Sequence, residues 1–206
     1  MNSPPAKSIS DLCSGVILAG GMSTRFSGRN KAMIQIAGER ILDRIYSVYS
    51  ELFTEIILVT NTPTEYLDWD LTVVTDLFPV RSSLTGIHAG MFYASRPYVF
   101  VCACDAPFIR KEIVQLVVSK TGPGADAVMP ETQNGLESLC ATYAVSQLSN
   151  VETHVRQEKF KIQRIFRKSR IRSIPEALVR QADPEGVSFI NINTPEDLRR
   201  VTLTAS

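Results

Sequence analysis

The sequence predicts an α/β fold, a single three-layer domain with a mostly parallel sheet and helices on both faces. Short apolar runs alternate with amphipathic stretches, which is typical of strand–helix–strand units. The runs are continuous and rich in β-branched residues, as expected of strands buried on both faces. The chain has 206 residues, 44% of them hydrophobic and 21% charged. These values fit one globular domain whose core needs neither disulfides nor a structural metal.

The first half of the chain carries the clearest elements. We expect strands at residues 15–19, 55–60, 71–75 and 98–103. Apolar residues at helical spacing predict a helix that contains Ile41, Ile45, Val48 and Leu52. The same spacing after Pro107 predicts another that contains Ile113, Leu116 and Val117. This order gives a parallel sheet with helical crossovers.

The second half is less regular. Residues 125–129 and 139–144 read as further strands, and residues 189–193 as a last strand. Thr194 at the N-cap and Pro195 at the first helical position then predict a C-terminal helix. The segment 156–172 has eight basic residues and one acid, with apolar residues between them that predict a helix with one packed face. We divide the chain into a polar N-terminal extension, 1–12, and one domain, 13–206.

Charge and apolar content exclude several classes of protein. Lys and Arg number 22 against 21 Asp and Glu, a net charge of +1, whereas proteins that coat nucleic acid or anionic membranes are far more basic. The N-terminus has no signal-peptide core, and the longest strongly apolar run, 98–104, is far shorter than the roughly 20 residues that span a bilayer. We therefore expect a cytoplasmic protein with no nucleic-acid or membrane partner. Its four cysteines, Cys13, Cys102, Cys104 and Cys140, are expected to be reduced core thiols.

A glycine-rich turn follows the first expected strand. In parallel sheets ligands bind beyond the carboxyl ends of the strands. Gly20 and Gly21 let the backbone approach a phosphate closely, Arg25 offers a planar fork for phosphate oxygens, and Lys31 adds a compact positive charge. The turn matches neither the P-loop nor the dinucleotide-binding fingerprint. An ordinary turn with basic surface residues is the alternative interpretation.

Two acids follow neighbouring strands. Asp76 comes after the third strand, and Asp105 after the fourth. Carboxylates at these ends can face the same crevice as the glycine turn, where one of them can hold Mg²⁺ while substrate phosphates supply other ligands. A helix cap or a turn is the alternative role for each acid alone.

These residues together resemble the molybdenum cofactor guanylyltransferases of the MobA type, within the Rossmann-like nucleotidyltransferases. The resemblance runs from about residue 16 to about residue 201. It rests on four motifs: Leu18-Ala19-Gly20-Gly21-x-Ser23-x-Arg25-x-x-Gly28-x-x-Lys31, Asp76 with the loop Ser83-Leu84-Thr85-Gly86-Ile87, Cys104-Asp105-Ala106-Pro107-Phe108, and Asn191-Ile192-Asn193-Thr194-Pro195-Glu196-Asp197-Leu198. The glycine turn is shared by many nucleotidyltransferases, and its combination with the last motif is much more specific.

The resemblance implies transfer of GMP from GTP to the phosphate of molybdopterin or Mo-molybdopterin, with release of pyrophosphate. It implies Mg²⁺ as cofactor and, as candidate partners, molybdoenzymes or their chaperones. Roles carried over by position make Arg25, Lys31 and Asp105 catalytic, with Asp105 the metal ligand. The nucleotide would contact Leu18, Ala19, Gly20, Gly21, Lys31, Asn61, Asp76 and Asp105. The pterin side would be formed by Asn191 and Asn193.

Several features leave alternatives open. Related cytidylyltransferases read L-A-A-G, and glycine at position 20 leaves room for a purine. Ser82-Ser83 replaces the usual G-P, and Glu137-Ser138 replaces a Gln or His followed by Pro. An acid at 137 that pointed inward would repel an anionic pterin.

The alternatives to guanylyl transfer are a molybdopterin cytidylyltransferase, a sugar-phosphate nucleotidyltransferase and a non-catalytic nucleotide-binding module. The segment 156–172 either attracts an anionic partner or is a solvated surface.

Overall fold

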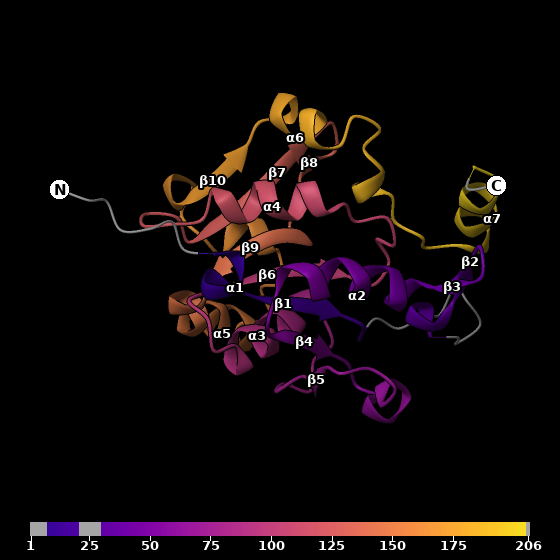
Figure 1. Cartoon of the computed structure of the whole chain (residues 1–206). Helices are drawn as coiled ribbons and strands as arrows, with labels where there is room; N and C mark the ends of the chain where they lie inside the picture. Colours follow the sequence, from indigo (N-terminus) through magenta and orange to yellow (C-terminus); the bar gives the residue numbers. More distant parts are fainter. Residues whose placement is uncertain (1–7, 21–29, 205–206) are drawn as a thin grey trace.

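A mostly parallel sheet with helices on both faces forms the centre of the molecule, as the sequence predicts (Figure 1). The computed structural model describes residues 8–20 and 30–204. Within this part of the chain the main sheet has eight strands, in the order β10-β7-β9-β6-β1-β4-β5, with β8 paired to β7. The strands are β1 (Cys13–Leu18), β4 (Ile56–Val59), β5 (Thr72–Val74), β6 (Tyr98–Ala103), β7 (Ala127–Thr132), β8 (Gly135–Leu136), β9 (Cys140–Ala144) and β10 (Ile171–Ile174).

Strand β1 lies at the middle of the sheet. It pairs in parallel with β4 on one side and β6 on the other, so that Val16 lies opposite both Ile57 and Val101. All six residues of β1 are buried, which explains its apolar run Val16–Leu18, and its one polar residue, Ser14, donates a hydrogen bond to Glu55. Strand β9 is antiparallel to β6 and β7, and β10 is parallel to β7. The carboxyl ends of β1, β4, β5 and β6 therefore meet at one edge.

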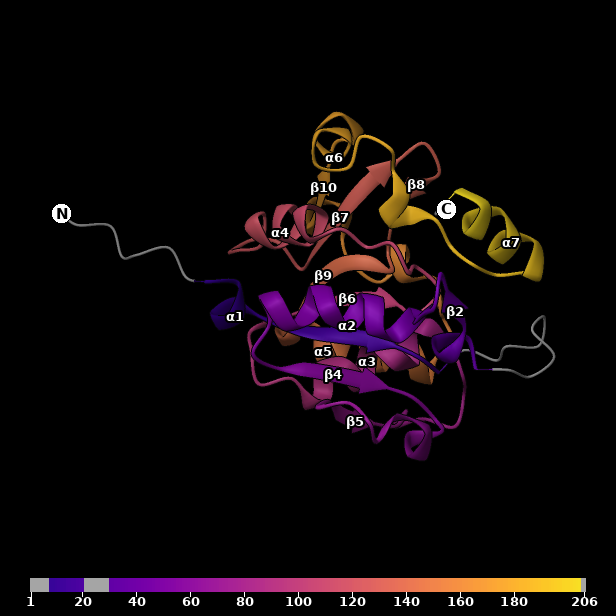
Figure 2. The same cartoon turned by 45° about the vertical axis from the view of Figure 1, so that its right-hand side comes forward.

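Two pairs of helices cover the sheet (Figure 2). Helices α2 (Ile41–Leu52) and α4 (Lys111–Ser119) pack on one face, and α3 (Ser83–Tyr93) and α5 (Leu148–Arg156) on the other. The shorter helices are α1 (Ile9–Leu12) and α6 (Glu176–Ala182), and α7 (Pro195–Thr204) lies beside the hairpin of β2 (Gln35–Ile36) and β3 (Glu39–Arg40) in both views. The 3₁₀ turns are η2 (Lys31–Met33), η3 (Pro63–Tyr66), η4 (Val145–Gln147), η5 (Ile162–Arg164), η6 (Lys168–Arg170) and η7 (Val187–Phe189).

Helix α3 lies unusually close to the sheet. A Cβ atom at Gly90 would lie 2.6 Å from a methyl group of Val16, and one at Gly86 would lie 3.1 Å from Leu18. Ser82 and Thr85 form a reciprocal capping box that fixes where the helix begins. The sequence predicts a loop rather than a helix here, because the helix is buried on nearly all sides and shows no amphipathic period. Its close packing places the first turn of α3 at the edge where the strands end.

Two sequence-based predictions are wrong. The segment 156–172 is not a helix: α5 ends at Arg156, and two 3₁₀ turns lead to β10. Glu158 has a left-handed backbone, with φ of 55°, and a continuous helix would align like charges three and four residues apart. Residues 189–193 are not a strand. The Ile192 amide donates to the Asp105 carbonyl, a single bond rather than a ladder.

The predictions for the C-terminal helix and for the cysteines are confirmed. The C-terminal helix begins at Pro195, as its cap sequence predicts. The four cysteines are free and buried. No helix in the described ranges is long and apolar enough to cross a membrane. Ile9 and Leu12 of α1 pack against the core, and the boundary between residues 12 and 13 stays a prediction.

Candidate active site

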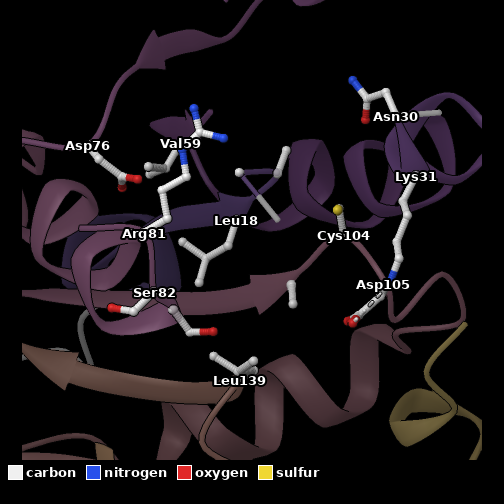
Figure 3. Close-up of a pocket in the computed structure, with 15 residues that line it drawn as sticks. Leu18, Asn30, Lys31, Val59, Asp76, Arg81, Ser82, Cys104, Asp105 and Leu139 are labelled. Atoms are coloured by element: carbon white, nitrogen blue, oxygen red, sulfur yellow. Dashed lines mark ion pairs between the residues drawn. The ribbon is translucent and has the colours of Figure 1, made fainter. Parts of the chain in front are cut away.

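A cavity of about 370 Å³ opens at the carboxyl ends of the strands (Figure 3). Residues from β1, β4, β6, the start of α3 and the loops between them line it. They are Leu18, Ala19, Gly20, Asn30, Lys31, Val59, Asp76, Arg81, Ser82, Ser83, Gly86, Ala103, Cys104, Asp105 and Leu139. Position and lining agree with the rule that ligands of parallel sheets bind beyond the strand ends. Gly20, Lys31 and both acids therefore meet at one cavity.

One end of the cavity holds an ion pair, which we call the Lys31–Asp105 end. The Lys31 Nζ atom lies 4.0 Å from Asp105 Oδ2, and the two side chains are 17% and 25% exposed. Nζ also donates to the Asn193 side-chain oxygen at 2.7 Å. The three residues come from a turn near the N-terminus, the end of β6 and the C-terminal segment. The close contact across 162 positions holds the lysine in place over the cavity.

Local hydrogen bonds fix the backbone on both sides of this pair. Asn30 caps the η2 turn, since its side-chain oxygen accepts from the Ala32 amide. The Asn30 amide group donates to Glu65 at 2.8 Å and to the Tyr66 hydroxyl at 2.7 Å. The amide of Cys104 donates to the Leu18 carbonyl, and the carbonyl of Asp105 accepts from Ile192. Lys31 and Asp105 are therefore both held by backbone and side-chain bonds around them.

Burial shapes the chemistry of this end. It raises the pKa of Asp105, while the Lys31 charge acts in the opposite direction. It also raises the pKa of the Cys104 thiol to about 12, so Cys104 is a neutral thiol at neutral pH and a poor nucleophile. The carboxylate of Asp105 is the group at this end that can bind a cation.

The protein groups at this end can bind Mg²⁺ only when a substrate supplies further ligands. No group of three or more His, Cys, Asp or Glu side chains in the described part of the chain is arranged to hold a metal. Mg²⁺ is commonly bound by one or two carboxylates together with substrate phosphates and water. Asp105, beside a lysine that can pair with a phosphate, fits that mode of binding.

The other end of the cavity holds a polar group that we call the Asp76 end. The Asn61 side chain donates to Asp76 Oδ2 at 2.9 Å. Burial raises the pKa of Asp76, while this hydrogen bond and the charge of Arg81 act in the opposite direction. A Cβ atom at Gly20 would lie 3.6 Å from Asn61 Nδ2, so Gly20 borders this end. Figure 3 shows Asp76 and Arg81 together, with Leu18 between them and the Lys31–Asp105 pair.

Most of the predicted site residues lie in or beside the cavity. Leu18, Ala19, Gly20, Lys31, Asp76 and Asp105 line it, and Asn61 contacts Asp76. Gly21 and Arg25 lie outside the described residues. Asn193 contacts Lys31, whereas Asn191 is exposed and separated from it by the buried Ile192. The roles of all these residues stay predictions.

Several lining residues were not predicted from the sequence. Arg81, Ser82 and Ser83 reach the cavity because α3 begins there, and the S/T-x-x-T capping pattern of Ser82 and Thr85 was the available signal. Glu137 is not among the residues that line the cavity, and its carboxylate accepts from the Thr132 hydroxyl at 2.7 Å. An inward-pointing acid at 137 is therefore not a feature of this cavity.

Comparisons with known proteins agree with this geometry. Residues 15–174 match the model of the MobA-like NTP transferase domain. The chain is 40% identical to the molybdenum cofactor guanylyltransferase of Desulfosudis oleivorans, over 92% of this chain and 94% of that protein. It is 32% identical to the probable molybdenum cofactor guanylyltransferase of Natranaerobius thermophilus, over 93% and 96%. The crystal structure of molybdopterin-guanine dinucleotide biosynthesis protein A from Archaeoglobus fulgidus matches with a TM-score of 0.80 and 27% identity, over 93% and 98%.

Fold and site together define a nucleotidyltransferase of Rossmann-like fold. The chain belongs to the MobA-like NTP transferase family, whose model covers residues 15–174.

Proposed function

We propose that the protein transfers GMP from GTP to the phosphate of molybdopterin or Mo-molybdopterin, which yields the guanine dinucleotide cofactor and pyrophosphate. Relatives that align along more than nine-tenths of the chain are named for this guanylyl transfer. The observation that supports it most is one cavity with a cation-binding end at Lys31 and Asp105 and a polar end at Asn61 and Asp76.

The reaction needs no covalent enzyme intermediate. An oxygen of the acceptor phosphate attacks the α-phosphorus of GTP, a new P–O bond forms, and the bond to the β-phosphate oxygen breaks with loss of pyrophosphate. Positioning and charge neutralisation then supply most of the catalysis. The one thiol of the described residues that lines the cavity, Cys104, is protonated at neutral pH, which agrees with direct transfer.

Each end of the cavity has a part in this scheme. Lys31 neutralises the triphosphate, and Asn193 keeps its ammonium over the cavity. Arg25, Leu18, Ala19, Gly20 and Gly21 contact the phosphates and the backbone side of the nucleotide. Asn61 and Asp76 contact the nucleoside, while Asn191 and Asn193 face the pterin. Mg²⁺ held by Asp105 and the phosphates would stabilise negative charge on the leaving pyrophosphate.

The cellular location and the recipients of the product follow from the proposed reaction. We place the protein in the cytoplasm, where GTP is available and buried thiols such as Cys13 and Cys102 stay reduced. Molybdoenzymes or their chaperones are the expected recipients of the product.

A nucleotide panel tests the proposal. Pyrophosphate release is measured with GTP, CTP, UTP and ATP, each with Mg²⁺ and with molybdopterin, with a sugar 1-phosphate or with no acceptor. We expect turnover with GTP and molybdopterin at a kcat/KM at least about tenfold above that with CTP. Turnover with CTP and not GTP would establish a cytidylyltransferase instead. Turnover with a sugar phosphate alone would establish the sugar-phosphate reaction, and binding without turnover would leave a nucleotide-binding module.

A further inference from the structure

Arg81 is a charged side chain of the cavity to which the scheme above gives no role. It lies in the segment between β5 and α3, directly before the N-cap residue Ser82. The residue is exposed, and it lines the cavity at the Asp76 end. Within the described ranges its guanidinium has no hydrogen-bond or ion-pair partner. Its donors are therefore available to a bound molecule.

The polar groups around Arg81 suit a neutral ring better than a phosphate. Asp76 is a carboxylate, Asn61 is a neutral amide that donates to it, and Arg81 is a cation, so the group carries no net charge. A phosphate that approached Arg81 would meet the Asp76 carboxylate nearby. A heterocyclic edge that offers both donors and acceptors satisfies both side chains.

The apolar neighbours suit a flat ring as well. Leu18 lies between the polar groups and the Lys31–Asp105 pair in Figure 3, and Val59 lies beside Asp76 and Arg81. Gly86 lines the cavity here too, and a Cβ atom at this position would lie 3.1 Å from Leu18, so a larger residue would crowd that side chain. A base held edge-on to Asp76 and Arg81 would have Leu18 or Val59 against its face.

We propose that Arg81 selects the base of the nucleotide by donating hydrogen bonds to O6 of guanine, while Asp76 accepts from N1 and the 2-amino group. Guanine presents O6 and N7 as acceptors, which an arginine fork matches, and N1–H and N2–H as donors, which a carboxylate matches. O6 and N1 are adjacent on the ring, so neighbouring side chains can read both. This inference rests on the proposed use of GTP and adds the residue that recognises O6.

Nucleotide analogues separate this role from a general effect of charge. Binding is measured by calorimetry with Mg²⁺ for GTP, CTP, inosine triphosphate and 2,6-diaminopurine ribonucleoside triphosphate. The diaminopurine analogue replaces the O6 acceptor with an amino group and the N1–H donor with an acceptor, and inosine triphosphate lacks only the 2-amino group. The proteins are the wild type, Arg81→Met, Arg81→Lys and Arg180→Met, the last being an exposed arginine of α6 that serves as the control.

We expect the wild type to bind GTP at least about tenfold more tightly than the diaminopurine analogue. Arg81→Met should lose the part of that ratio that comes from O6, through weaker GTP binding with little change for the analogue, and should keep the part that comes from N1–H and Asp76. Arg81→Lys should recover it only in part, because lysine lacks the planar fork. The penalty for inosine triphosphate should be equal in the wild type and Arg81→Met, and Arg180→Met should behave as the wild type.

Other results overturn the inference in distinguishable ways. If Arg81→Met weakens GTP and the analogue by the same factor, Arg81 acts on the phosphates or through its charge. If neither affinity changes, Arg81 makes no contact with the nucleotide. If the wild type itself shows no preference for GTP over CTP, the proposed function fails together with this inference.

Discussion

The two ends of the cavity are built in different ways. The Lys31–Asp105 end joins residues from three distant parts of the chain, with Lys31 bonded to Asn193 across 162 positions. The Asp76 end is local: Asn61, Asp76 and Arg81 lie on two loops that follow neighbouring strands, β4 and β5. Lys31 and Asp105 are mostly buried, whereas Arg81 is exposed.

Under the proposed function, the two ends have different tasks. The reaction requires fixed charges in a water-poor setting, and the many long-range contacts around Lys31 and Asp105 supply that rigidity. Recognition of the base requires only a few donors and acceptors on loops. Substitutions in the loops should therefore change nucleotide preference without disturbing the chemistry, and substitutions at the other end should do the reverse.

The largest effect is expected from Asp105→Asn. We expect pyrophosphate release to fall by about 100-fold or more, because the metal loses its carboxylate ligand. The melting temperature of the ligand-free protein should not fall, since burial disfavours the charged carboxylate and asparagine removes that charge. Steady-state kinetics and thermal unfolding check both statements. Asp76→Asn is the matched control, which should raise the KM for GTP more than it lowers kcat.

The pH dependence should reflect the raised pKa of Asp105. Below that pKa the carboxyl is protonated and cannot bind Mg²⁺, so activity should fall by about tenfold per pH unit on the acid side. At Mg²⁺ concentrations too low to saturate the site, the inflection should lie above the ordinary aspartate value, because burial raises this pKa. Saturating Mg²⁺ should lower the inflection, because the cation favours the charged carboxylate. An inflection at or below the ordinary value at low Mg²⁺ would contradict the burial of Asp105.

The same shift predicts a trend in stability. Folding raises the pKa, so the folded chain holds this proton more tightly than the unfolded chain. Stability of the ligand-free protein therefore declines as pH rises through the interval between the ordinary and the raised pKa. Chemical denaturation at several pH values should show a weaker decline for Asp105→Asn than for the wild type.

An intermediate effect is expected from the C-terminal segment. Asn193→Ala removes the acceptor that holds Lys31, so kcat should fall by about tenfold. Asn191→Ala is the matched change two residues away, at an exposed position next to the buried Ile192. It should raise only the KM for the acceptor. Equal effects of the two substitutions on kcat would contradict the separate role of Asn193.

The smallest effect is expected from Gly20→Ala. The added methyl group would lie 3.6 Å from the Asn61 amide, an ordinary contact, so the melting temperature should not change. It narrows the Asp76 end, and GTP affinity should fall by roughly threefold to tenfold with little change for CTP. Calorimetry with both nucleotides measures this. A larger loss for CTP than for GTP would show that the base does not lie beside Gly20.

The sequence predicted those parts that depend on local pattern. The apolar runs of β1, β4 and β6 and the amphipathic α2 show clear periods, and the rule for parallel sheets then brought Lys31, Asp76 and Asp105 to one edge. Helix α3 was missed because it is buried on nearly all sides. For such a helix the hydrophobic period disappears, and only its cap remains visible.

Contacts between distant residues could not be read from the sequence. The bond between Lys31 and Asn193 depends on where the C-terminal segment crosses the site, and residues 189–193 looked like a strand because they alternate in polarity. The Ile192 amide donates a hydrogen bond to the Asp105 carbonyl, and these residues do not form a ladder with a strand of the sheet. Arg81 was missed for the related reason that its place in the cavity follows from the start of α3.

The central claim is tested most directly by calorimetry of the wild type and Lys31→Met. Each protein is titrated with GTP and with CTP, in the presence of Mg²⁺ and in the presence of a chelator. We predict that GTP binds at least about tenfold more tightly than CTP, and that its affinity drops sharply on chelation or when Lys31 is neutralised. GTP binding that is indifferent to both Mg²⁺ and Lys31, or tighter binding of CTP, would contradict a guanylyl-transfer site at this cavity.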